Sequence, residues 1–116
     1  MRLLLRVCFC LTLFAFPAFL EAQTKGADEY HAHCARCHAD DGSGKGHATR
    51  IKMQDLRSKE VQALTDQELF ETIARGTKHK EYPHAFLYTG MTKEQIESVV
   101  AFIRGLKDSS KQGKTP

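Results

Sequence analysis

The feature that most constrains the fold of this chain is one five-residue run, Cys34-Ala35-Arg36-Cys37-His38. Two thiols separated by two residues can each add across one vinyl group of a haem, which leaves two thioether bonds to the ring. The histidine that follows the second cysteine is then held against the ring, where its imidazole can ligate the iron. The spacing Cys-x-x-Cys-His is typical of covalent haem attachment. It predicts one covalent haem per chain, held by Cys34 and Cys37, with His38 as an iron ligand.

The paired cysteines have two other possible interpretations. A Cys-x-x-Cys pair can be a thioredoxin-like redox site, but that site belongs to a βαβ unit, and no stretch here alternates with the period of a strand. The pair can also be half of a zinc site completed by His79 and His84. The spacing from Cys37 to His79 is far longer than in zinc fingers, and the remaining cysteines, Cys8 and Cys10, lie at the N-terminus. Haem is therefore the favoured interpretation.

The first 22 residues of the 116-residue chain have the features of an export signal. Arg2 and Arg6 supply the positive start, residues 7–16 form a short apolar run, and Ala22 is a plausible cleavage point. The run is shorter than the roughly 20 residues of a membrane-spanning helix. The cleavage site stays open, and an uncleaved anchor is the alternative. We expect a periplasmic or otherwise exported protein, membrane-anchored if the segment is retained.

The part of the chain after the predicted signal is small and nearly balanced in charge. Without Arg2, Arg6 and Glu21 it carries 15 basic and 13 acidic residues, interspersed along the sequence. No basic patch rich in aromatic residues is present, which argues against a nucleic-acid partner. About 94 residues bury only a thin core, so a bound cofactor would help to stabilise the fold.

The first helix is expected over residues 26–37. Gly26 and Tyr30 lie four positions apart, hence on one face, and a small residue beside a ring suits a close helix crossing. Residues 40–46 form a glycine-rich loop. A phosphate site is not favoured, because no strand precedes the loop and no Gly-Lys-Ser/Thr follows it. We expect its glycines to permit positive φ and close backbone approach beside the haem.

Two further helices begin with the same local pattern. Thr65 and Glu68 form a capping box, and Gly76 ends that helix; Thr92 and Gln95 form the box of the last helix. An apolar residue precedes each cap and can pack against the fourth helical residue as a hydrophobic staple. The predicted buried stripes are Leu69, Phe70 and Ile73 in one helix and Ile96, Val99, Val100 and Ile103 in the other, with Phe102 beside the second.

The remaining segments are irregular. Residues 47–60 are polar, with Leu56 and Val61 expected to close one edge of the haem. From Lys107 onward the sequence has no apolar period, so residues 108–116 are predicted to form a disordered polar tail. With no strand pattern anywhere, the expected product is an all-α domain of three main helices around one flat apolar cofactor.

Residues 24 to 107 resemble a small class I c-type cytochrome. The resemblance is carried by Gly26, Tyr30, the run from His33 to His38, the loop from Asp41 to Gly44, the helix from Glu68 to Gly76, the start of the last helix from Thr92 to Ile96, and the run from Val99 to Arg104. It implies the small cytochrome c fold, in which short helices and loops complete three main helices around covalent haem c with its iron. It also implies that Gly26 and Tyr30 cross the last helix at Phe102.

The same resemblance implies a second iron ligand, and here the sequence departs from the family. Such proteins usually carry Met-Pro in the loop before the last helix, where this chain has Tyr82-Pro83. Met91 is the only late methionine, but it occupies the staple position that Leu64 occupies in the earlier helix. For the domain over residues 24–107, the ligand at the sixth iron position therefore stays undecided. The candidates are His84, Met91, His79, Tyr82 and Met53, and the alternative is that no residue fills the position.

Three functions compete. The favoured one is a monomeric, non-enzymatic one-electron carrier between membrane-bound or soluble protein redox partners, with no small-molecule substrate. A basic docking rim could be formed by Lys45, Arg50, Lys52, Lys78 and Lys80. The alternative is a haem module that binds or senses a diatomic gas at an open sixth position. A peroxidase-like enzyme would need an acid/base pair over the iron, and no histidine and arginine are placed convincingly for it.

Overall fold

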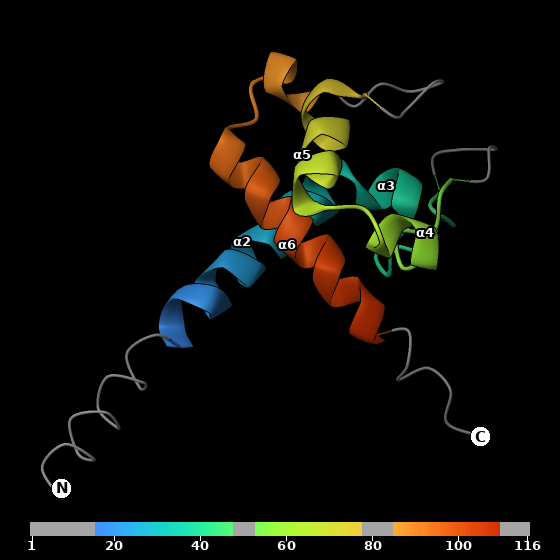
Figure 1. Ribbon diagram of the computed structural model, residues 1–116, viewed down its shortest axis with the longest axis horizontal. Coiled ribbons are helices and arrows are strands. Elements are labelled where there is room, and N and C mark those ends of the chain that lie inside the picture. The colour runs from blue at the N-terminus through green and yellow to red at the C-terminus, as the bar shows by residue number, and fades with distance from the viewer. Residues whose placement is uncertain (1–15, 48–52, 78–84, 110–116) are drawn as a thin grey trace, which may run out of the picture.

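Every regular element of the described chain is helical. The computed structural model describes residues 16–47, 53–77 and 85–109, and those ranges contain no strand (Figure 1). The elements are α2 (Phe16–His33), α3 (Ala35–His38), α4 (Lys59–Gln62), α5 (Asp66–Arg75), the 3-10 helix η1 (Phe86–Thr89) and α6 (Lys93–Ser109). The predicted all-α class is confirmed, and α2, α5 and α6 are the three main helices. No helix within these ranges is long and apolar enough to cross a membrane.

Helix α2 differs from its predicted limits at both ends. It begins at Phe16, ten residues before Gly26 and inside the segment interpreted as an export signal, and it ends at His33. Residues 16–25 are rich in good helix formers, and Glu21 and Lys25 form an exposed ion pair of 2.9 Å one turn apart. At the other end Cys34 adopts φ −116° and ψ −39°, and α3 begins after it. The predicted helix over 26–37 is therefore two helices.

The close crossing expected at Gly26 is confirmed. Helices α2 and α6 pack against each other more extensively than any other pair of elements, and they cross near the centre of the molecule (Figure 1). A Cβ at Gly26 would overlap the carbonyl oxygen of Ser98 on α6 and would lie 3.2 Å from Cβ of Phe102. One turn further along α2, the ring centroid of Tyr30 lies 4.7 Å from that of Phe102. Glycine is what allows the two backbones to approach this closely.

Both predicted capping boxes are present. The Thr65 hydroxyl accepts from the backbone N–H of Glu68 at 3.1 Å, and the Glu68 carboxylate accepts from the backbone N–H of Thr65 at 2.9 Å. At α6 the Gln95 side-chain oxygen accepts from the backbone N–H of Thr92 at 2.8 Å, and the Thr92 hydroxyl accepts from the backbone N–H of Gln95 at 3.2 Å. Helix α5 ends, as predicted, at Gly76 with φ 70°.

The core is built from the predicted stripes of α5 and α6. Leu69, Ile73, Ile96, Val99, Val100 and Ile103 are all buried, while Phe70 and Phe102 pack half-buried against them. The helix α6 continues through Ser109, beyond the predicted start of a disordered tail at residue 108. Leu106, which is buried near the end of α6, lies against Gly42 and fixes this part of the helix on the glycine-rich loop. Residues 110–116 lie outside the described residues.

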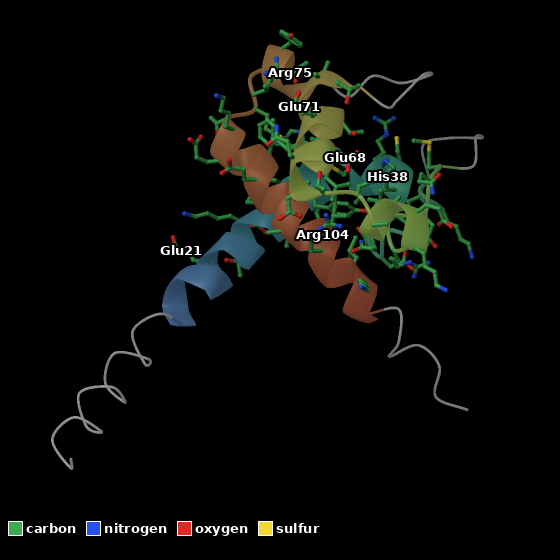
Figure 2. The ribbon with its side chains drawn as sticks, in the orientation of Figure 1. Glu21, His38, Glu68, Glu71, Arg75 and Arg104 are labelled. Carbon is green, nitrogen blue, oxygen red and sulfur yellow. The ribbon has the colours of Figure 1, made fainter. Side chains whose placement is uncertain are left out.

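Polar side chains also tie α6 to the segment before α5. The Arg104 guanidinium binds Asp66 Oδ1 at 2.8 Å and donates to the carbonyl oxygens of Gln62 and Leu64 (Figure 2). The Gln62 side-chain amide spans the same junction, donating to the carbonyl oxygens of Leu56 at 2.8 Å and Ile103 at 3.1 Å. The bonds from Arg104 supply donors for the carbonyls of Gln62, at the end of α4, and of Leu64, in the link before α5, which lack intrahelical donors.

The helix crossing yields the first prediction. Gly26→Ala places a methyl group against the α6 backbone, so we expect the midpoint of denaturant unfolding to fall, at a cost of about 1–3 kcal/mol. Gly105→Ala is the matched control, because Gly105 is exposed on α6 and nothing lies within 4 Å of a Cβ built there. There alanine should stabilise the helix by about 0.5–1 kcal/mol. Equal effects of the two substitutions would contradict the crossing.

Candidate functional site

The three residues of the predicted attachment motif share one face of a single helical turn. Cys34 stands at the N-cap of α3, and Cys37 and His38 lie within it. Residues three and four positions apart are neighbours on a helix surface, so Cys34 lies beside Cys37 and His38. The turn is closed by backbone bonds to the Cys34 carbonyl from Cys37 at 3.0 Å and from His38 at 2.9 Å.

His38 is the one polar residue buried among those described, with 4% of its surface exposed (Figure 2). Its Nδ1 lies 3.3 Å from the carbonyl oxygen of Gln54. A carbonyl can only accept, so Nδ1 carries the proton in this pair. The remaining nitrogen, Nε2, then has the lone pair that a metal requires, and the bond to Gln54 fixes the tautomer of the ring.

A cavity of about 370 Å³ opens beside this histidine. Its apolar wall combines α4, α5, η1 and α6, and the polar groups at its surface are few. The lining residues are Tyr30, Cys34, His38, Gln54, Leu56, Glu60, Val61, Leu64, Leu69, Thr72, Ile73, Phe86 and Ile103. Leu56 and Val61 thus line the cavity, as predicted. A pocket that is mostly apolar, with a few polar groups at one end, is typical of a cofactor site.

Cys34 lines the cavity, and Cys37 lies half-buried one turn away without lining it. Both thiols are free, so the pair is not a disulfide. Burial, and to a smaller extent nearby Cys37 and Glu29, raises the pKa of Cys34 to about 12. Burial therefore disfavours a charged thiolate at Cys34, whereas the neutral sulfur of a thioether bond would not be disfavoured in this way. Within the described ranges no group of three or more His, Cys, Asp or Glu side chains could hold a metal ion.

The glycine-rich loop folds back onto the attachment turn. The Gly44 N–H donates to the His38 carbonyl at 2.9 Å, and the Gly46 N–H donates to the Cys37 carbonyl at 3.2 Å. Gly44 has φ 76°, and a Cβ there would overlap the carbonyl oxygen of Met53. The predicted combination of positive φ and close backbone approach is present, and its effect is to lock the motif's carbonyls in place.

A charged cluster that the sequence analysis missed holds the Gln54 segment. Arg57 binds Asp55 Oδ1 at 3.0 Å and Asp41 Oδ2 at 3.1 Å, while the Leu56 N–H donates to the Gly42 carbonyl at 2.8 Å. The bond to Arg57 is the main cause that lowers the pKa of Asp55. Because Gln54 supplies the carbonyl that orients His38, this cluster supports the site indirectly. The cluster could not be predicted from a local sequence pattern, because it joins two separate loops.

The candidates for the sixth iron position are not brought together. Met91 is buried, with 9% exposed, but it is not among the lining residues of the cavity. It borders a separate hollow on the other side of Phe86, together with His33, Thr89, Gly90 and Gln95. Met53 is half-buried and also does not line the cavity. His79, Tyr82 and His84 lie outside the described residues.

The residues present fit a covalently attached, flat and apolar group. Neutral sulfur is favoured at Cys34, His38 has its tautomer fixed for metal binding, and the cavity wall beside them is apolar. A search of curated proteins found no match to this sequence. The sequence model of the family described as Cytochrome c matches residues 23–107, which is most of the chain. The chain belongs to the cytochrome c family, whose domains carry covalently bound haem c with its iron and serve in electron transfer.

Proposed function

We propose that this protein is an exported one-electron carrier whose haem is attached through Cys34 and Cys37, with His38 as the iron ligand on one side. The observation that supports this most directly is His38 itself, buried in the cavity wall with Nδ1 committed to the Gln54 carbonyl. Haem supplies the one-electron chemistry when bound. The protein orients the imidazole and surrounds the group with apolar side chains, which tune its reduction potential.

The character of the cavity favours a carrier over an enzyme. Among its described lining residues, Tyr30 donates its hydroxyl to the Ala39 carbonyl at 2.8 Å, and Thr72 donates to the Glu68 carbonyl at 2.7 Å. Glu60 is exposed at the rim. Hydroxyl groups committed to backbone carbonyls are poorly suited to acid–base catalysis. A carrier needs no such group, because electron transfer requires only a rigid site close to the surface.

Partner proteins would meet the haem edge across a charged surface. Lys45 is exposed on the glycine-rich loop, and Arg36 is exposed within the attachment motif itself. The other members of the predicted basic rim, Arg50, Lys52, Lys78 and Lys80, lie outside the described residues. A basic rim steers acidic surfaces of soluble or membrane-bound redox proteins toward encounter and weakens with added salt. Export is supported by the signal-like N-terminus, since attachment of haem c accompanies export of such domains.

Gas binding is the second candidate function, and it is supported by the position of Met91 away from the cavity. The methionine that could have closed the sixth position packs at the start of α6, with its N–H bonded to the Phe86 carbonyl at 3.1 Å. If no residue from another part of the chain fills that position, a diatomic ligand can reach the iron.

The attachment is tested by extraction and by matched substitutions. In acidified acetone the haem should stay with the protein, because thioether bonds survive unfolding. Cys34→Ala or Cys37→Ala should reduce haem retention strongly, and His38→Ala should remove the strong-field low-spin spectrum. Cys10→Ala is the control, since that cysteine lies in the predicted signal. Quantitative extraction of haem from the unaltered protein would contradict covalent attachment.

The staple role of Met91 gives a separate prediction. Met91→Leu keeps the apolar volume at the start of α6 but cannot bind iron, so it should cost less than about 1.5 kcal/mol and leave the spectrum unchanged. His84→Ala and His79→Ala are compared in parallel. Loss of a Met–iron absorption band, or a sharp fall in reduction potential, in Met91→Leu would make Met91 the ligand. The gas-binding function would be favoured if the unaltered reduced protein binds carbon monoxide and none of the three substitutions changes the absorption spectrum.

A further inference from the structure

The residue directly after His38 adopts a backbone conformation that alanine rarely takes. Ala39 has φ 65° and ψ 162°, a region populated almost only by glycine. Such a conformation persists only where surrounding bonds hold it. The Ala39 N–H donates to the Ala35 carbonyl at 2.8 Å, and the Ala39 carbonyl accepts from two donors, Tyr30 Oη at 2.8 Å and the Gly42 N–H at 3.2 Å.

One of those donors comes from a different helix and lies in the cavity wall. Tyr30 is fully buried on α2, and it lines the same cavity as His38. Its ring is fixed from the other side by Phe102 of α6, at a centroid distance of 4.7 Å. The hydroxyl is thus placed by the crossing of α2 and α6 and not by the short turn that it contacts. Packing alone would not require this oxygen, since phenylalanine fills nearly the same volume.

The carbonyl that accepts from Tyr30 belongs to the peptide between residues 39 and 40, directly after the peptide that leaves His38. The carbonyl of His38 accepts from the Gly44 N–H at 2.9 Å, and its ring bonds to the Gln54 carbonyl at 3.3 Å. Relaxation of φ at Ala39 would turn these two peptides relative to each other, and with the Ala39 carbonyl held by Tyr30 and Gly42 it would move the His38 carbonyl away from the Gly44 N–H. The bond that holds the backbone of His38 therefore depends on the conformation of Ala39.

We propose that Tyr30 is a positioning residue for the axial histidine: its hydroxyl holds Ala39 in the strained conformation and so fixes the orientation of the His38 imidazole toward the haem iron. This role rests on the proposed function of His38 as an iron ligand. It assigns to α2 a function besides packing. The helix crossing places the Tyr30 hydroxyl, and one hydrogen bond from that hydroxyl then affects the orientation of the iron ligand.

The test compares Tyr30→Phe with the unaltered haem-bound protein by NMR in the ferric state. Removing the hydroxyl should shift the haem methyl resonances, which respond to the orientation of the axial imidazole. Amide hydrogen exchange at Ala39, Gly42 and Gly44 should become about fivefold faster, while exchange at Val99 in α6 stays nearly unchanged. Tyr88→Phe is the matched control, because it removes a hydroxyl from a tyrosine that is 76% exposed. It should alter neither readout.

A second variant tests the path through Ala39. Glycine takes the observed conformation without restraint, so Ala39→Gly should leave the methyl resonances close to their original positions. In the Ala39→Gly background, Tyr30→Phe should then shift them much less than it does with alanine present.

Each outcome decides the matter. Methyl resonances that stay in place in Tyr30→Phe, or exchange that accelerates equally throughout α6, would show a merely structural tyrosine and overturn the proposal. An equal effect of Tyr30→Phe with alanine and with glycine at position 39 would overturn the route through Ala39. Failure of His38 as the iron ligand would be seen separately, as a low-spin spectrum that survives His38→Ala in protein with an intact Tyr30.

Discussion

The structure depends on a cavity in its own core. Side chains from α4, α5, η1 and α6 converge on a space of about 370 Å³ beside His38, and most of them are apolar. Without a bound group, the apolar side chains that line this space have no packing partners on that side. The haem that the family carries is therefore part of the core, and the protein's helices are arranged to enclose it.

The rest of the molecule holds the walls of that space in position. The crossing of α2 and α6 at Gly26 sets the frame, and Arg104 and Gln62 connect α6 to the segment that carries α4 and α5. The attachment turn is held from two sides, by the glycine-rich loop through Gly44 and by the Gln54 carbonyl through His38. A haem bound at this turn, as we propose, would experience a rigid environment, which suits electron transfer because little rearrangement accompanies a change of charge.

Features encoded by neighbouring residues could be predicted from the sequence. The capping boxes at Thr65 and Thr92, the glycine end of α5 and the buried stripes all follow local rules, and each is present. The beginning of α2 could not be predicted, because residues 16–22 have the features of an export signal. Short helices were expected, but the positions of α4 and η1 could not be predicted, because four residues carry too little periodicity to detect. The Gln54 carbonyl, Arg57 and Ala39 could not be predicted at all, since their roles arise from contacts between loops and from backbone geometry.

The most direct test of the haem as core is the unfolding of the chain without it. Protein made with both Cys34 and Cys37 replaced by alanine and purified free of haem would be heated beside the haem-bound protein, with helix content followed by circular dichroism. The account predicts a sharp cooperative transition for the haem-bound protein and low helix content with no cooperative transition for the haem-free chain, because the short helices have too little to bury alone. A haem-free chain that is fully helical and melts cooperatively would contradict it.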